Sequence, residues 1–399
     1  MLSEKQIEQL TASLIGKYNK IGIEIIHRYG AKIKEIKEAD SKSTSLIKLR
    51  AVKPEANEFG YLIDRKLQEH MEEMFAMLLT VAVLEYQASE DLYKHTGTVF
   101  TPFYNNVGIQ NVIKGVTDEV NDIFHKLFKQ PGFVIRDLKN PEITKAMSVS
   151  ETYQSIVDEA IQNKENPIDF DVAMRKTEEQ LINSGFRSIY VDPVTGRTYT
   201  QRLDVAARNN MLDAVSMMQT AVQLEMAKQF GADGVELSAH EFSALDHEPF
   251  QGHQFTMDNW DRIQSSLDFE DINGQRFMGV ERIIGVWNCR HYPTAIIVGY
   301  SKPKYSNAEL ANFIENNRVG YKLPNGKHLT MYECTQRQRR YEANIRQARE
   351  GVYLANIVDN KSLQEKYKAL LANRITNYET FSIECGLPVQ MNKTRIVTE

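Results

Sequence analysis

The chain has 399 residues, of which 42% are hydrophobic and 25% are charged, with a formal net charge of −5 at pH 7. This is the composition of an ordinary folded protein, which excludes a wholly disordered chain, and the acidic balance argues against a dedicated DNA-binding domain. The three cysteines, at irregular spacing, exclude a disulfide framework.

The first 135 residues are predicted to be helical. Apolar residues from Ile7 to Ile25 recur every three or four positions, which places them on one face of a helix with Ser3 as its N-cap. Two further helices are expected over residues 61–95 and 107–129. The sequence leaves open whether these helices bury their apolar faces within the chain or against a partner.

The middle of the chain alternates between helix and strand. Residues 150–184 are expected to be helical, and a hairpin of strands at 186–191 and 197–200, rich in β-branched and aromatic residues, follows them. The clearest helix of the sequence covers residues 203–230, and a short strand follows at 235–238.

Turn-forming residues dominate positions 239–305, which we expect to be irregular. Helical periodicity returns at 329–348 and 362–380, and an extended tail is expected from 386 to 399.

Together these elements predict an α+β fold that is predominantly helical. We expect a helical N-terminal region at 1–135 and a mixed core domain, with a loop-rich His/Cys segment, at 145–305. A helical C-terminal segment and tail should occupy 306–399.

The irregular segment concentrates side chains that can bind a metal ion. His247, His253, Cys289 and His291 form a nitrogen and sulfur set of the kind that zinc prefers. Their spacing is looser than in a zinc finger, so two interpretations stay open. The residues either bind zinc or hydrogen-bond one another in a region with little apolar core.

The same residues suggest two enzymatic alternatives. A metal-dependent nuclease of the HNH type would need a ββα frame, but the segment from Asn288 to His291 is short and Pro293 follows it. A Cys289/His247 nucleophile pair has no supporting motif. The glycine-rich motifs of nucleotide-binding sites do not occur. We therefore expect a protein without enzymatic activity.

Two stretches carry local positive charge. Residues 1–53 hold 11 Lys and Arg against 6 Asp and Glu, and an Arg-rich run with interspersed Glu covers residues 336–350. Such mixed charge indicates a solvated or salt-bridged helix in most cases. The alternative is contact with DNA or with an acidic protein surface.

Five motifs stand in a fixed order along the second half of the chain. They are AARNN at 206–210, GADGVELSAH at 231–240, HEPFQG at 247–252, GVWNCRH at 285–291 and YECTQRQR at 332–339. This series resembles the phage minor capsid protein 2 family over about residues 150–350, and it is distantly similar to the head-morphogenesis proteins of the phage Mu F type. The motif residues carried over, besides the His and Cys residues above, are His240, Gln251, Gly252, Asn288 and Arg290.

The chain departs from the family pattern at two places. The Ala-Arg-Pro stretch between the first two histidines is absent from residues 242–246, and Phe250 stands where the family carries Trp. Loss of the arginine weakens any role that needs positive charge there, whereas Phe250 keeps an aromatic ring.

The resemblance implies a minor component of the virion, present in a few copies inside the phage head near the portal. Its expected partners are the portal protein and other head proteins, with genomic DNA as a further candidate. Its expected role is to assist head assembly and genome packaging or delivery. The alternative is a virion-carried metal-dependent nuclease or a toxin-like, ADP-ribosyltransferase-like enzyme. The longest apolar run, residues 75–84, is about half the length that spans a bilayer, so we expect no membrane span and synthesis in the host cytoplasm.

Overall fold

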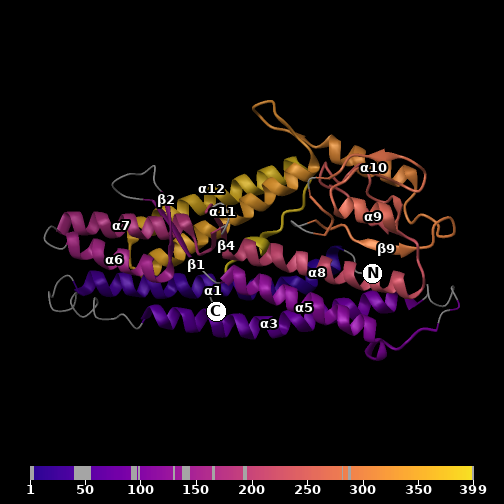
Figure 1. The fold of residues 1–399 in the computed structure, drawn as a ribbon. Helices are drawn as coiled ribbons and strands as arrows, with labels where there is room; N and C mark the ends of the chain where they lie inside the picture. Colours follow the sequence, from indigo (N-terminus) through magenta and orange to yellow (C-terminus); the bar gives the residue numbers. More distant parts are fainter. Residues whose placement is uncertain are drawn as a thin grey trace. The chain divides into compact units, whose positions relative to one another are not determined.

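The structure is a computed structural model, and it describes residues 4–39, 55–90, 97, 99–128, 131–136, 144–163, 167–191, 196–280, 282–285 and 289–397. The helices are α1 (Glu4–Ala39), α3 (Glu55–Ala88), η1 (Phe103–Asn105), α5 (Val107–Phe128), α6 (Val149–Asn163), α7 (Pro167–Ser184), α8 (Leu203–Gln229), α9 (Met257–Gln264), α10 (Asn307–Val319), α11 (Met331–Ile357), α12 (Lys361–Glu384) and η2 (Met391–Thr394). The strands are β1 (Pro131–Arg136), β2 (Thr144–Ser148), β3 (Arg187–Val191), β4 (Thr198–Arg202), β5 (Gly234–Leu237), β6 (Gln254–Thr256), β7 (Phe269–Glu270), β8 (Arg276–Phe277), β9 (Pro293–Ile296), β10 (Tyr321–Lys322) and β11 (His328–Leu329). Long helices and small antiparallel sheets (Figure 1) confirm the predicted α+β, predominantly helical class.

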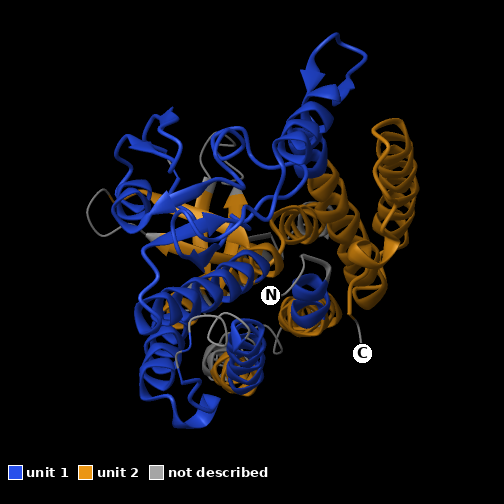
Figure 2. Ribbon diagram, turned by 90° about the vertical axis from the view of Figure 1, so that its right-hand side faces the viewer, with its two compact units in different colours: residues 1–12, 72–122, 208–337 blue, residues 13–71, 123–207, 338–399 orange. Residues whose placement is uncertain are grey.

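The chain divides into two compact units, each assembled from three separate stretches of sequence (Figure 2). Unit 1 comprises residues 1–12, 72–122 and 208–337, and unit 2 comprises residues 13–71, 123–207 and 338–399. The division into three consecutive regions expected from the sequence stays a prediction.

A four-stranded antiparallel sheet in the order β2-β1-β3-β4 lies in unit 2. Its β3–β4 hairpin confirms the predicted one, with Tyr190 opposite Tyr199, whereas β1 and β2 were not expected. Helices α6 and α7 pack beside β1 (Figure 1). Both helices fall within the stretch 150–184 that was predicted to be helical, and residues 164–166 between them lie outside the described residues. Pro167 begins α7, where its fixed φ and missing N–H suit the first helical position.

The apolar face of α1 is buried by unit 2 itself. The Tyr18 side chain is fully buried, and its ring centroid lies 5.2 Å from that of His70 and 5.6 Å from that of Phe124. Tyr29 packs edge-on to Phe133 at 5.2 Å. The question that the sequence left open is therefore answered for this helix, whose face packs within the chain.

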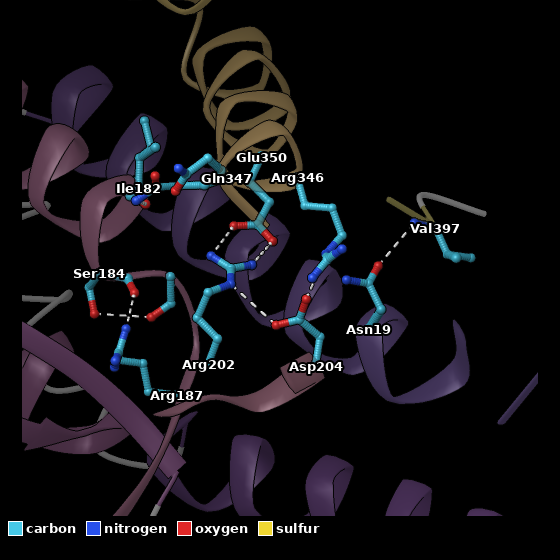
Figure 3. A network of polar contacts seen from close by, with 12 residues as sticks. Asn19, Ile182, Ser184, Arg187, Arg202, Asp204, Arg346, Gln347, Glu350 and Val397 are labelled. Atoms are coloured by element: carbon cyan, nitrogen blue, oxygen red, sulfur yellow. Dashed lines mark hydrogen bonds and ion pairs between the residues drawn. The ribbon is translucent and has the colours of Figure 1, made fainter. Parts of the chain in front are cut away.

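A buried ion-pair network joins the start of α8 to α11 within unit 2 (Figure 3). Arg202 lies 2.5 Å from Glu350 through Nη2 and Oε1, and 3.2 Å from Asp204 through Nε and Oδ1. Arg346 closes the network by donating from Nε to Asp204 Oδ2 at 2.8 Å. The four side chains are at most 16% exposed. At these positions the Arg-rich run is salt-bridged within the chain.

Unit 1 contains a second antiparallel sheet, in the order β6-β5-β9, against which α9 packs. Its core is a cluster of buried residues that belong to the segment from 235 to 289. They are Val235, Leu237, Phe250, Phe255, Trp260, Ile263, Phe269, Val280, Ile284 and Cys289. The expectation that residues 239–305 are irregular is therefore wrong in part, because short strands and a helix with a shared core lie among the turns.

Element boundaries differ from the predicted ones mainly at helix ends. Helix α3 begins before the predicted 61 and ends at Ala88, while residues 91–95 of the predicted range lie outside the described residues. Helix α11 runs nine residues beyond the predicted end at 348. The tail after residue 386 includes the short helix η2. No helix in the part of the chain that the structure describes is both long and apolar enough to cross a bilayer.

Candidate metal centre

The pairing of β5 with β9 brings two distant segments together in unit 1. The strands are antiparallel, with Leu237 opposite Pro293. The end of β5 therefore lies beside the start of β9, and the residues after β5 and those before β9 leave the sheet at the same end of this strand pair. Ser238 N–H donates to Tyr292 O at 3.0 Å, and Tyr292 N–H donates to Ser238 Oγ at 3.0 Å. These bonds fix the segment 289–291 beside the segment that begins at 239.

The chain between β5 and β6, residues 238–253, forms a closed loop, the excursion. Gly252 N–H donates to Leu237 O, and Leu237 N–H donates to His253 O, both at 3.0 Å. Gly252 has φ +75°, and a Cβ there would lie 2.4 Å from Leu310 Cδ2. Glycine is thus required where the excursion returns to the sheet.

Three of the four predicted metal ligands converge. The Sγ of Cys289 lies 3.4 Å from His247 Nδ1 and 3.4 Å from His291 Nδ1. The three ligand atoms lie within 4.8 Å of one another, and the residues are 8%, 1% and 1% exposed. His253 lies apart from them, with its Nδ1 2.8 Å from Asp271 Oδ2.

The opposite ring nitrogens fix which tautomer each histidine adopts. His247 Nε2 lies 2.7 Å from the carbonyl oxygen of Arg282, which can only accept, so Nε2 carries the proton. Gln251 Oε1 accepts from the backbone N–H of His240 at 3.1 Å and lies 3.2 Å from His291 Nε2, so that nitrogen also donates. Both Nδ1 atoms therefore present lone pairs to the sulfur of Cys289.

Burial keeps the cluster uncharged. Desolvation lowers the pKa of His247, and it lowers the pKa of His291 well below the ordinary value, so both rings are neutral at neutral pH. Burial raises the pKa of the Cys289 thiol. Hydrogen bonds from the backbone of Gly285 and His291 lower this pKa, but the effect of burial is larger.

Side chains that sequence reasoning missed hold the excursion in place. Asn317, 1% exposed on α10, donates from Nδ2 to Ser243 O at 3.0 Å and to Glu248 Oε1 at 2.9 Å. Arg282 forms two bonds with the carboxylate of Asp246, at 2.5 and 2.9 Å. Neither residue carries a local sequence signal, since their partners are 36 to 74 positions away.

Two of the family motif residues, His240 and Gln251, contact the same cluster. The ring of His240 stacks on that of His291, with centroids 4.5 Å apart, and burial lowers the pKa of His240. Gln251 and Gly252 have the roles given above. The guanidinium of Arg290 lies 3.8 Å from Glu8 Oε1, and Asn288 lies outside the described residues.

A cavity of about 270 Å³ adjoins the cluster within unit 1. Cys289 and His240 line it together with Gln219, Tyr292 and Lys304. The site thus presents two imidazole nitrogens and one sulfur to a common point, with space for a small molecule beside them.

The chain matches the model of the phage minor capsid protein 2 family over residues 2–379. Neither the curated proteins nor the solved structures contain a match. The matched region includes the cluster, the excursion and the ion-pair network of unit 2. Because it spans nearly the whole chain, this protein belongs to the phage minor capsid protein 2 family and is a structural protein of the phage head.

Proposed function

We propose that the protein is bound at the portal, on the inner side of the phage head, where it assists head assembly and genome packaging or delivery. The observation that carries this proposal is the family match over residues 2–379. The portal location follows the resemblance of the ordered motifs to head-morphogenesis proteins of the Mu F type.

The burial of the His/Cys cluster supports a structural role over the enzymatic alternative. His247 and His291 are each 1% exposed, and their outer nitrogens are engaged by Arg282 O and Gln251 Oε1. A nuclease must bring its metal against a phosphodiester backbone, whereas this cluster meets, through Cys289, a cavity of about 270 Å³ that suits a small molecule better than a nucleic-acid strand. A structural capsid family likewise favours a protein that is not an enzyme.

The described part of the basic N-terminal stretch supports a protein partner over DNA. On α1, Arg28 pairs with Glu24 at 3.3 Å, Lys32 pairs with Glu35 at 2.9 Å, and Lys37 pairs with the buried Glu178 of α7. These three basic side chains are thus already paired within the chain, and paired charges release few counterions on DNA binding. We therefore assign the portal protein, rather than the genome, as the first partner.

Co-expression with the portal protein of the same phage tests this proposal. We expect the chain to sediment with portal rings at a fixed ratio, because a specific interface buries about 1,200–2,000 Å² and resists dilution. The portal protein of an unrelated phage serves as the control and should not retain the chain. Separate sedimentation of the chain and its cognate portal at micromolar concentration would contradict the proposal.

A further inference from the structure

We propose that His247 Nδ1, His291 Nδ1 and Cys289 Sγ bind one zinc ion in unit 1. This inference concerns how the excursion between β5 and β6 is held, and it does not depend on the portal role. It also differs from the ligand set that the sequence suggests, because His253 is paired with Asp271 and takes no part.

The distances fit a tetrahedral ion. Zinc–sulfur bonds of about 2.3 Å and zinc–nitrogen bonds of about 2.0–2.1 Å at tetrahedral angles place sulfur and nitrogen about 3.6 Å apart. The two Sγ to Nδ1 distances are 3.4 Å each. Both sulfur–nitrogen pairs are thus already near the separation that a shared zinc requires.

The hydrogen bonds around the site orient both rings as metal ligands. In protein zinc sites the ligating histidine usually donates its other ring N–H to a carbonyl or carboxylate oxygen. Arg282 O fills that role for His247 and Gln251 Oε1 fills it for His291. Gln251 is itself oriented by the N–H of His240.

Without a cation, the cluster cannot satisfy its own polar atoms. Two buried Nδ1 lone pairs face Cys289, and a thiol has one proton to donate, so it can serve only one of them. A buried acceptor without a donor costs about 1–3 kcal/mol. A zinc ion bound to the thiolate accepts both lone pairs at once and removes this cost.

Among the described residues, three ligand atoms converge. A water molecule from the adjoining cavity completes the tetrahedron, since Cys289 and His240 line that cavity. The ion then joins the excursion, through His247, to the segment before β9, through Cys289 and His291. It acts as a cross-link in a part of unit 1 whose strands have only two to four residues.

The experiment is metal analysis of the tag-free chain after zinc saturation and desalting. We expect about one zinc ion per chain in the wild type and in two matched controls, His253→Ala and Cys334→Ser. Cys334 is buried in α11 and is not one of the three converging ligands, and His253 tests the four-ligand alternative. In Cys289→Ser and His291→Ala we expect zinc affinity to fall by more than about 100-fold.

A second measurement keeps the proposal testable if those variants do not fold. The wild-type chain loaded with Co²⁺ should show the intense visible bands of tetrahedral cobalt and one sulfur-to-cobalt charge-transfer band in the near ultraviolet. A wild-type chain that retains no zinc and lacks the charge-transfer band overturns the proposal. Full zinc retention by folded Cys289→Ser overturns it equally, and zinc loss in His253→Ala alone would move the site to His253 and Asp271.

Discussion

Replacing Glu350 with alanine is expected to lower the free energy of unfolding of unit 2 by about 3–5 kcal/mol, the usual cost of removing one partner from a buried ion pair. Glu350 is 4% exposed on its side chain and holds both terminal nitrogens of Arg202, at 2.5 and 3.1 Å. Without it, the Arg202 guanidinium keeps only Asp204 as an ionic partner among the contacts in Figure 3. Urea denaturation followed by circular dichroism, with hydrogen exchange of α11 peptides, measures the loss.

Two further variants show whether the loss comes from the unpaired charge. Glu365→Ala, on the exposed face of α12, should change stability by less than about 0.5 kcal/mol. The double variant Arg202→Met, Glu350→Leu should recover part of the loss, because apolar residues can replace a buried ion pair at little cost. A loss below about 1 kcal/mol in Glu350→Ala would contradict the account of this network.

The same network gives the stability a defined pH dependence. Burial alone would raise the pKa of Asp204, but Arg202 and Arg346 outweigh it and hold the pKa below its ordinary value. The contribution of Asp204 to the free energy of unfolding is therefore fully present above its unfolded pKa of about 4, and it is lost as the pH falls toward the folded pKa. The stability difference between wild type and Asp204→Asn should shrink over that acidic range.

Replacing Phe255 with alanine is expected to destabilise unit 1 by about 3–5 kcal/mol, the usual cost of deleting a buried aromatic side chain. Phe255 is fully buried on β6, and its ring lies 5.7 Å from that of Phe269. Trp260 and Cys289 belong to the same cluster. Tryptophan fluorescence in urea, to which Trp260 and Trp287 both contribute, therefore measures the loss, and the rate at which a thiol reagent labels Cys289 should rise with it.

Met278 supplies the matched comparison for this core, since its side chain is 83% exposed. Met278→Ala should leave the unfolding curve within about 0.5 kcal/mol of the wild type and the labelling rate unchanged. Equal effects of the two substitutions would show that the aromatic cluster does not hold unit 1 together.

Local signals account for the elements that were predicted correctly. The β3–β4 hairpin follows from β-branched and aromatic residues on either side of turn residues, and α5 and α8 follow from their apolar periodicity. Strands β1 and β2 were not predicted because they form by pairing with each other and with β3, and no local sequence pattern marks them. The start of α7 at Pro167 had a signal, proline at the first helical position, that periodicity alone does not weigh.

The candidate site was predictable in chemistry but not in geometry. His247, Cys289 and His291 stand out by residue type, and the pairing of β5 with β9 explains why they meet. His253 shares their chemistry but lies where the chain enters β6, and its ring nitrogen meets Asp271 instead. Asn317, which anchors the excursion from α10, gave no signal because an asparagine in a helix has no distinctive pattern. Only the fold reveals such a contact.

Quantitative mass spectrometry of purified virions and of DNA-free proheads tests the central claim most directly. A portal-bound minor head protein should be present in both particles, in a constant ratio to the portal protein and far below the major capsid protein. Detection of the portal protein in both particles, with this chain absent from both, would contradict the account.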